Sequence, residues 1–342
     1  MIVAPAREMS ASAAWDADVA ACGGSLLQSW MWGEFKRRAG WVVERTRVER
    51  DGKIALAQVL VRAKGPVSIG YLPRGPLFSA RDAELASALF AEVDRVCREH
   101  RALGLIVEPE APLPFRGRYR AHGFVRGPAP IQPVRTVKTP LLADEPLLMQ
   151  MHQKTRYNIR LAQRRGVAVR AARPDEVGVF YEMLRDTAGR NEFGIHAEAY
   201  YADFLNAAGD QAALLYSEID GAPVAGLIVA RFADEAIYMY GASSTQRRAH
   251  GAAFLLQFEA MRWARDRGCR RYDLWGIPPT DPETTQVDER DRLAPTRGED
   301  WRGLYEFKVR FGGTIVRYPP ALERRYVPGL TALARRVYRP AG

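Results

Sequence analysis

The chain is predicted to be an α/β protein of two tandem lobes, each built on a mixed sheet. Its 342 residues are more than one hydrophobic core usually organises, and the 47% that are hydrophobic are enough for two cores. It also contains an approximate internal repeat, in which residues 51–109 correspond to residues 220–278. Each copy follows the order turn, strand, strand, helix, strand, and such alternation is typical of α/β lobes.

In the first copy, Asp51-Gly52 predicts a tight hairpin turn, and residues 54–61 and 67–72 predict two strands. Residues 103–107 predict a buried strand at the end of the copy. Between these strands, apolar side chains recur every three or four residues and predict a helix with one buried face: Leu85, Leu89, Val93 and Val96.

The second copy repeats the order. Asp220-Gly221 predicts the turn, residues 224–232 and 236–240 predict two strands, and residues 252–267 predict the helix. Residues 271–275 predict the closing strand. We therefore expect the two copies to form equivalent lobes.

A proline-rich crossing separates the copies, and it predicts a domain boundary near Ala143. Residues 149–165 follow and predict a strongly basic helix. The prolines of the crossing are Pro128, Pro130, Pro133 and Pro140.

The net charge of +10 and the pI of about 9.7 predict attraction to polyanions such as RNA, nucleotide phosphates and anionic lipid. The first 21 residues lack the apolar core of a signal peptide, and no window is apolar enough to span a membrane. We therefore expect a soluble, cytoplasmic protein. Cys22, Cys97 and Cys269 are widely spaced, which predicts free thiols and neither a disulfide framework nor a metal site.

One short motif suggests phosphate binding. The segment Arg248-Ala249-His250-Gly251-Ala252-Ala253 fits the R-x-x-G-x-A loop of acyl-CoA acetyltransferases of the GNAT superfamily. A small-residue turn that opens a helix presents free N–H groups to a phosphate. The alternative is a helix start that needs small residues for close packing. Residues 78–82 of the first copy have no such loop, so at most one lobe would hold a CoA-like ligand.

Several segments taken together resemble the Fem family (FemA, FemB and FemX type) of non-ribosomal peptidyltransferases, which build peptidoglycan cross-bridges. The resemblance extends in order over nearly the whole chain. The segments are Leu26-Leu27-Gln28-Ser29-Trp30 with Trp32 and Lys36, Tyr71-Leu72-Pro73-Arg74-Gly75-Pro76, Lys154-Thr155-Arg156-Tyr157-Asn158-Ile159-Arg160, and Trp301-Arg302-Gly303-Leu304-Tyr305-Glu306-Phe307-Lys308 with Phe311-Gly312-Gly313.

The resemblance implies two tandem GNAT-like domains with mixed sheets. Residues 1–143 would form domain 1, completed by the C-terminal segment 318–342, and residues 144–317 would form domain 2. It also implies a monomer that transfers an amino acid from aminoacyl-tRNA to the stem-peptide amine of a peptidoglycan precursor, either UDP-MurNAc-pentapeptide or lipid II. Because the tRNA ester is already activated, aminoacyl-tRNA is a co-substrate and no cofactor or metal is expected.

For catalysis, the resemblance assigns Lys308 as the donor that stabilises the oxyanion. This lysine lies in a run that we interpret as strand-like, and without the motif it would be a surface lysine. Phe307 either walls the same pocket or packs in a core. Glu108, at the end of a buried strand, is a candidate to orient the acceptor or remove its proton, and the alternative is a structural pair with an arginine. None of the five scattered histidines is assigned as a base.

For the acceptor, Lys36 and Arg190 match diphosphate-binding residues of the family, one in each lobe. Tyr240 is assigned as a further acceptor contact, with a packed strand tyrosine as the alternative. Arg74, in the resembling loop, is assigned to the same substrate site.

For tRNA, the basic helix offers cations over much of its surface, and a solvated basic helix is the alternative. Arg324, Arg325, Arg335 and Arg336 suggest either peripheral contact with anionic lipid or a docked terminal helix. Two other functions stay open, an acyl-CoA-dependent N-acyltransferase and a non-catalytic RNA-binding protein. The cations assigned to tRNA are Lys154, Arg156, Arg160 and Arg164.

Overall fold

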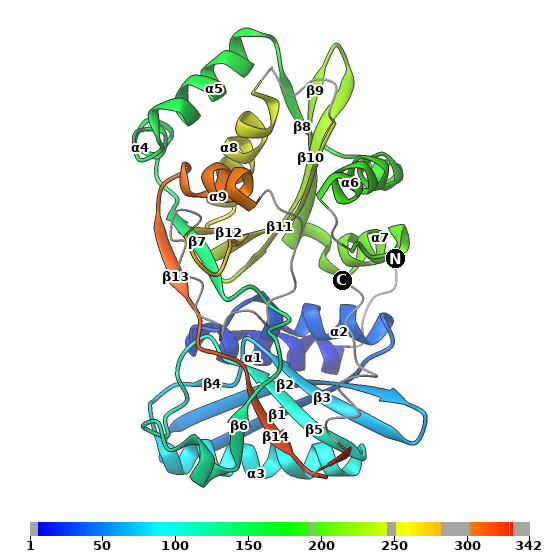
Figure 1. Cartoon of the computed structure of the whole chain (residues 1–342), viewed down its shortest axis with the longest axis vertical. Helices are drawn as coiled ribbons and strands as arrows, with labels where there is room; N and C mark the ends of the chain where they lie inside the picture. Colours follow the sequence, from blue (N-terminus) through cyan, green and yellow to red (C-terminus); the bar gives the residue numbers. More distant parts are fainter. Residues whose placement is uncertain (1–5, 192–193, 245–250, 282–300, 328, 331–342) are drawn as a thin grey trace. The chain divides into compact units, whose positions relative to one another are not determined.

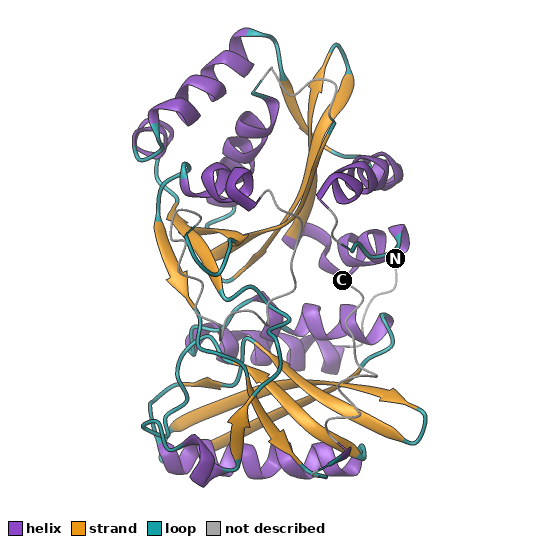
Figure 2. Cartoon of the chain, viewed as in Figure 1, coloured by secondary structure: helices purple, strands orange, loops and turns teal. Residues whose placement is uncertain are grey.

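The structure is a computed structural model that describes residues 6–191, 194–244, 251–281, 301–327 and 329–330. The chain divides into two compact units (Figures 1 and 2). Unit 1 takes Met1–Gln132 together with Tyr318–Pro340, and unit 2 takes Pro133–Arg317. Each unit contains a mixed sheet with helices on both faces.

The sheet of unit 1 has the order β1-β2-β3-β5-β14-β6, with β4 paired to β2. The pair β3–β5 is parallel and the other pairs are antiparallel. Its elements are α1 (Ala6–Ala21), η1 (Leu26–Gln28), α2 (Trp30–Arg38), β1 (Val42–Arg50), β2 (Lys53–Lys64), β3 (Val67–Pro73), β4 (Leu77–Phe78), α3 (Ala83–Glu99), β5 (Ala102–Glu108), η2 (Tyr119–His122), β6 (Phe124–Arg126) and β14 (Leu322–Arg325).

Helix α3 covers one face of this sheet, while α1 and α2 cover the other (Figure 1). Asp82 begins α3 because its carboxylate accepts hydrogen bonds from the N–H groups of Glu84 and Leu85. The stripe predicted from the sequence is buried against the sheet as expected: Leu85, Leu89, Val93 and Val96.

The sheet of unit 2 has the order β13-β7-β12-β11-β10-β9-β8, in which only β11–β12 is parallel among the described strands. Its elements are β7 (Arg135–Pro140), α4 (Asp144–Met149), α5 (Gln153–Arg164), β8 (Ala168–Ala171), η3 (Pro174–Glu176), α6 (Val177–Asn191), α7 (Glu198–Ala208), η4 (Gly209–Gln211), β9 (Ala212–Ile219), β10 (Ala222–Phe232), β11 (Glu235–Ser243), α8 (Ala252–Arg265), β12 (Arg271–Gly276), α9 (Trp301–Val309) and β13 (Thr314–Arg317).

Helix α8 packs on one face of this sheet, with α5 and α9 on the same side, and α6 and α7 pack on the other face (Figure 1). The core between α8 and the sheet is apolar and includes Ile159 of α5, Leu255 of α8 and Phe311 after α9. Burial of apolar surface stabilises the fold by about 25 cal/mol for each Å² removed from water. The side chains of this core therefore hold α5, α8 and α9 against the sheet.

The predicted internal repeat is confirmed. Asp51-Gly52 and Asp220-Gly221 both adopt positive φ at two successive residues (52° and 71°, then 52° and 74°), as a hairpin turn of this type requires. In each unit the helix then returns the chain to a strand that lies parallel to its predecessor, β3–β5 in one and β11–β12 in the other. The prediction of two related α/β lobes with mixed sheets is therefore correct.

The segment interpreted as a proline-rich crossing contains a strand. Residues 135–140 form β7, which lies between β12 and β13 in the second sheet. Unit 2 therefore begins at Pro133, before the predicted boundary at Ala143. Proline is tolerated at strand ends, and Pro133 precedes β7 while Pro140 ends it.

The C-terminal cations do not lie on an amphipathic helix where the structure describes them. Arg324 and Arg325 belong to β14, which is inserted between β5 and β6. Arg324 pairs with Asp94 at 3.2 Å and Arg325 pairs with Glu323 at 2.7 Å, so both are held within unit 1. Arg335 and Arg336 lie outside the described residues. Among the helices that the structure describes, none has the length and apolar character needed to cross a bilayer.

Candidate active site

Lys308 lies on helix α9, and its side chain is only 5% exposed. Its ammonium donates a hydrogen bond at 2.9 Å to the main-chain carbonyl of Gly276, the last residue of β12. The same nitrogen lies 5.3 Å from the centre of the Tyr238 ring, within the range of a cation–π contact. The surface-lysine alternative is therefore excluded.

The strand-like interpretation of this run is wrong, because residues 301–309 form a helix. Apolar and polar side chains alternate from Tyr305 to Phe311, which imitates the period of a strand. The helix is supported by an ion pair between Glu306 and Arg310, one turn apart at 2.6 Å. Gly312 and Gly313 then end it with φ values of 83° and 97°.

Phe307 is half-buried and packs edge-to-face against Phe254 and Phe311, with ring centroids at 5.1 and 5.2 Å. It therefore joins α9 to the core beneath α8. These contacts describe the core role anticipated for Phe307, and its place in the wall of a pocket stays a prediction.

Tyr238 is a residue near Lys308 that sequence reasoning missed. A bulge at Met239 makes Tyr238 and Tyr240 face consecutive residues of β10, Val229 and Ile228, so the two tyrosines point to opposite faces of the sheet. Strict alternation along a strand would have placed them on the same face, and no sequence signal marks the bulge. Burial raises the pKa of the Tyr238 hydroxyl to about 12, so it stays neutral.

Tyr240 consequently belongs to an aromatic cluster on the other face of β11. Its ring contacts that of Tyr201 of α7 edge-to-face at 5.0 Å, and its hydroxyl is hydrogen-bonded to that of Tyr200. Burial raises its pKa well above the ordinary tyrosine value. Arg190 is the penultimate residue of α6, which packs on this face of the sheet, and its side chain lies outside the described part of the structure.

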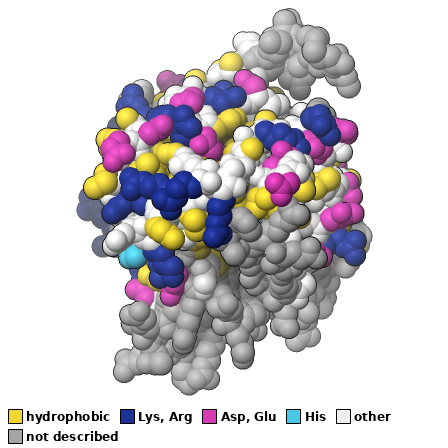
Figure 3. Space-filling view, turned by 90° about the horizontal axis from the view of Figure 1, so that it is seen from above, with side chains coloured by type: hydrophobic (Ala, Val, Ile, Leu, Met, Phe, Trp, Pro, Cys, Tyr) yellow, Lys and Arg dark blue, Asp and Glu magenta, His cyan; other side chains and the backbone are white. Residues whose placement is uncertain are grey.

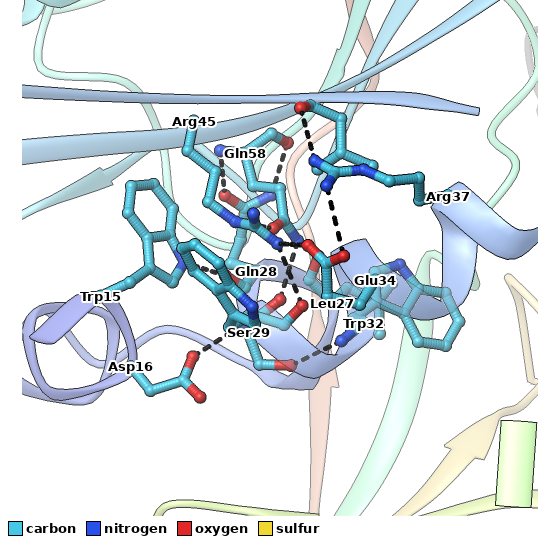
Figure 4. A network of polar contacts seen from close by, with 12 residues as sticks. Trp15, Asp16, Leu27, Gln28, Ser29, Trp32, Glu34, Arg37, Arg45 and Gln58 are labelled. Atoms are coloured by element: carbon cyan, nitrogen blue, oxygen red, sulfur yellow. Dashed lines mark hydrogen bonds and ion pairs between the residues drawn. The ribbon is translucent and has the colours of Figure 1, made fainter. Parts of the chain in front are cut away.

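In unit 1, Lys36 lies in the last turn of α2, and a buried polar network fixes this helix (Figure 4). Ser29 caps α2 by accepting a hydrogen bond from Trp32 N at 3.2 Å. Arg45 of β1 donates to the Trp30 carbonyl and to the Glu34 carboxylate, both at 3.0 Å. The helix is therefore tied to the sheet on which it packs.

Two buried glutamines extend this network. The Gln58 side chain accepts from Arg45 at 2.8 Å and donates to the Ser29 carbonyl at 2.9 Å. Gln28 accepts from Gln58 N at 2.8 Å and donates to the Pro73 carbonyl at 2.6 Å. Two segments that resemble the Fem family, around Gln28 and Pro73, are thus joined by one hydrogen-bonded side chain.

The Lys36 ammonium is half-buried and lies over aromatic rings, 4.6 Å from that of Trp32 and 5.0 Å from that of Phe35. Burial, with a smaller effect from the positive charge of Arg62, lowers the pKa of Lys36 to about 7. An anion that approached this lysine would favour its charged form.

Glu108 is buried at the end of β5, and both of its oxygens accept hydrogen bonds. Oε2 accepts from the Tyr71 hydroxyl at 2.6 Å and from Gln132 N at 3.0 Å, while Oε1 accepts from Ile131 N. Burial raises the pKa of Glu108, and these hydrogen bonds oppose the rise. The carboxylate therefore ties residues 131–132 to the sheet in this structure.

Arg74 lies in the loop after β3, with its guanidinium 2% exposed and stacked 3.5 Å above the ring of Tyr318. It adopts a φ of 51°, and a cis peptide bond joins the next two residues, Gly75 and Pro76. Arg74 is also a positive charge near Glu108 and favours its ionised form. Arg74 and Glu108 therefore lie close together at the ends of β3 and β5.

Replacing Glu108 with glutamine is expected to destabilise unit 1 by about 1–3 kcal/mol, because an amide NH₂ would face a main-chain N–H and leave a buried donor unsatisfied. Urea denaturation of the variant would measure this loss. Glu84→Gln on α3, which removes only an exposed ion pair with Arg50, is the matched control and should change stability much less. Unchanged stability in Glu108→Gln together with lost activity would instead assign the carboxylate to the chemistry.

The basic helix predicted over residues 149–165 corresponds to α5, which begins at Gln153. Met149, the first residue of the predicted range, is the last residue of α4. Lys154, Arg160 and Arg164 are exposed, and none of them forms an ion pair with a carboxylate of the described residues. Arg156 differs, because it is half-buried and donates to the Met151 carbonyl at 2.6 Å. Figure 3 looks down on the end of unit 2 where α5 lies, and Lys and Arg side chains gather there beside exposed hydrophobic ones.

The loop that fits the GNAT phosphate motif is described only from Gly251, since Arg248 and His250 lie outside the described residues. Gly251 has a φ of 71° and precedes α8. A Cβ at this position would lie 2.5 Å from the Asn158 carbonyl oxygen of α5. The close approach of α5 to the start of α8 therefore requires glycine here, as the packing alternative anticipated.

The two units together define a tandem GNAT-like protein. Residues 150–282 match the model of the acetyltransferase (GNAT) domain. A tandem GNAT protein from the clavulanic acid biosynthesis pathway superposes with a TM-score of 0.50 at 14% identity, covering 84% of this chain and 83% of that one.

Within that class, the resemblance to the Fem family is confirmed. Residues 14–117 match the FemAB family model, and the crystal structure of FemX superposes with a TM-score of 0.80 at 20% identity, covering 97% of this chain and 98% of that one. Lipid II:glycine glycyltransferases of Staphylococcus epidermidis and Staphylococcus aureus are 22% and 23% identical, each over 84% of this chain and 85% of the relative.

Proposed function

We propose that this protein is a cytoplasmic aminoacyltransferase that moves an amino acid from aminoacyl-tRNA onto the stem-peptide amine of a peptidoglycan precursor. The observation that carries the proposal is the buried Lys308 ammonium, held by the Gly276 carbonyl on the helix that bears the Phe307-Lys308 motif. A fixed ammonium in apolar surroundings is suited to stabilise developing negative charge. The names of the staphylococcal relatives, glycyltransferases acting on lipid II, support the same class of reaction.

In the proposed reaction, the amine nitrogen of the acceptor attacks the carbonyl carbon of the tRNA ester and forms a C–N bond. The carbonyl oxygen becomes an oxyanion, which the Lys308 ammonium stabilises. When the oxyanion collapses, the bond from carbon to the tRNA 3′ oxygen breaks, and the proton lost by the amine is balanced by the one that this oxygen gains. Alignment of the two substrates supplies much of the remaining rate, because the ester needs no further activation.

For the acceptor, we propose that Lys36 and Arg190 bind the diphosphate, with Tyr240 as a further contact. The diphosphate is shared by the soluble nucleotide precursor and the lipid-linked one, so these residues fit both acceptors. Lys36 suits this role because its pKa of about 7 allows it to bind a proton together with the anion. Arg74, assigned to the same site from the resemblance, is only 2% exposed and stacked on Tyr318, so we propose that it supports the end of β3 rather than touching the acceptor.

For the donor, we propose that the outward face of α5 binds the phosphate backbone of tRNA. Cations elsewhere in the chain are commonly paired: Arg95 of α3 lies 2.9 Å from Glu92 and 2.6 Å from Glu99, and Arg265 of α8 lies 2.6 Å from Asp144. The exposed cations of α5 have no such partners among the described carboxylates, and Tyr157 beside them is 57% exposed. Unpaired cations beside an exposed ring are suited to a nucleic acid.

Replacing Lys154 and Arg160 with glutamine is expected to weaken tRNA binding and to make it less sensitive to salt. Each lost phosphate contact should lower the slope of log Kd against log salt concentration by about 0.7–0.9. Filter binding of charged tRNA at several salt concentrations measures the slope. Arg95→Gln is the matched control, and an equal slope in the double variant and the parent would rule out α5 as the tRNA surface.

The proposed function is tested by offering the purified protein a mixture of charged tRNAs with each acceptor and identifying the product by mass. RNase treatment of the donor should stop the transfer. The GNAT domain match over residues 150–282 favours one second candidate, an acyl-CoA-dependent N-acyltransferase. Acylation of an amine by acetyl-CoA alone would support that candidate and contradict the aminoacyl-tRNA proposal.

A further inference from the structure

The segment 276–281, which begins with the last residue of β12, is held by a buried arginine of β7. The carbonyl of Arg135 accepts a hydrogen bond from Ile277 N at 3.1 Å, and its guanidinium donates to the Pro278 carbonyl at 3.0 Å and to Asp281 Oδ1 at 2.6 Å. The Arg135 side chain is 2% exposed. Both ends of this short segment are therefore tied to the second sheet.

Asp281 also contacts the helix that carries Lys308. Its Oδ1 atom accepts a hydrogen bond from the Tyr305 hydroxyl at 3.0 Å, in addition to the one from Arg135. Tyr305 and Lys308 are three residues apart on α9, so they lie on neighbouring turns of one face. The Asp281 carboxylate thus links β7 to α9, the helix on which the Lys308 ammonium donates to the Gly276 carbonyl.

The chain before Gly276 is equally constrained. Trp275 adopts a φ of 60°, which is costly for a residue with a side chain, and its N–H donates to the buried Asp273 carboxylate at 2.7 Å. Asp273 also accepts a hydrogen bond from Thr136 of β7. A Cβ on Gly276 would lie 2.9 Å from the Pro133 side chain, so only glycine fits. The direction of the Gly276 carbonyl is therefore set by its neighbours.

We propose that Asp281 is a positioning residue for Lys308, acting through Tyr305 on α9 and through the segment that carries the Gly276 carbonyl. This inference rests on the proposed function, in which the Lys308 ammonium stabilises the oxyanion. The Asp281 carboxylate is 46% exposed, whereas the Arg135 guanidinium with which it pairs is 2% exposed, so the pair contributes to stability as well. The effect proposed for Asp281 is on geometry, and a displacement of about 1 Å at a catalytic group can cost about 10²-fold in rate.

Asp281→Ala, which removes the Oδ1 acceptor, and Tyr305→Phe are each expected to lower kcat about tenfold, with little change in the KM for the acceptor. In the Lys308→Met background, neither substitution should lower kcat further, because the group that they position is absent. Glu306→Gln is the matched control, since Glu306 pairs with Arg310 on the same helix and does not contact residues 276–281. An equal fold-loss in both backgrounds, or no loss in the parent, would overturn the proposal.

A second measurement does not depend on transfer activity. Acetic anhydride labelling of the Lys308 amine, with exposed Lys154 as internal reference, should be about two- to tenfold faster in Asp281→Ala and in Tyr305→Phe, as expected when the hydrogen bond between residues 281 and 305 is lost. Unchanged labelling in both variants would overturn the positioning role. If Lys308→Met keeps full activity while the labelling rates rise, the catalytic assignment of Lys308 fails and the positioning of its side chain stands.

Discussion

Lys308→Met is expected to lower kcat at least about 10²-fold, with little change in the affinity for the acceptor. The methionine keeps the length and apolar contacts of the side chain but removes the ammonium, which in the proposed reaction acts only when the oxyanion forms. The Gly276 carbonyl would also lose its hydrogen-bond donor. Single-turnover kinetics with a charged tRNA and a saturating acceptor would measure the loss.

Two comparisons separate this effect from misfolding. The thermal unfolding of Lys308→Met shows whether the variant is folded at the assay temperature, and Glu306→Gln reports what an uninvolved charge on α9 contributes to the rate. Parental kinetics in Lys308→Met would remove Lys308 from the catalytic machinery. A loss confined to the KM for the acceptor would make it a binding residue instead.

Acceptor affinity is expected to fall as pH rises above about 7, by up to about tenfold per pH unit. Lys36 has a pKa of about 7 in the free protein, and a bound diphosphate would raise it. Binding above that pH therefore takes up a proton, whereas below it Lys36 is already charged and the affinity should be flat. Calorimetry with the nucleotide-linked acceptor between pH 6 and 9 would measure this dependence.

Lys36→Met and Lys36→Arg make the test specific. The methionine variant should bind weakly with no pH dependence from this residue, and turnover at a saturating acceptor concentration should stay near that of the parent. The arginine variant stays charged throughout, so its affinity should not vary between pH 7 and 9. A pH dependence that persists in both variants would assign the titration to another group.

The lowered pKa of Lys36 also makes the free energy of unfolding depend on pH. The pKa of Lys36 is about 7 in the folded protein and 10.5 as its ordinary value, so the unfolded chain binds more protons between these two pH values. The contribution of Lys36 to the free energy of unfolding is therefore lowest below pH 7 and rises up to about pH 10.5. Lys36→Met should be more stable than the parent at pH 6, and this advantage should shrink by pH 9.

The parts of the fold that could be predicted from the sequence are those with local signals. The Asp-Gly turns, the strands that follow them, α3 and α8 all have a turn motif or a hydrophobic period within a few residues. Strand pairing over long distances has no such signal, so the insertion of β14 between β5 and β6 and the place of β7 in the second sheet were not predicted.

The candidate site divides in the same way. Lys308, Lys36 and Glu108 were chosen from motifs, and the structure buries or half-buries each of them among specific partners. Tyr238 and Asp281 could not be found, because the bulge at Met239 and the hydrogen bonds of Asp281 depend on strands and helices far away in the chain. Glycines at positions 251 and 276 are explained only by the atoms that approach them.

The sequence by itself determined that this protein has two related α/β lobes, and that Lys308 and Lys36 are the cations to consider first. Tertiary structure alone decided that α9 is a helix, that Glu108 ties down residues 131–132, and that the Gly276 carbonyl accepts the Lys308 ammonium. The physical reason is that turns and amphipathic periods act over a few residues. Burial, hydrogen-bond direction and pKa depend on groups that only folding brings together.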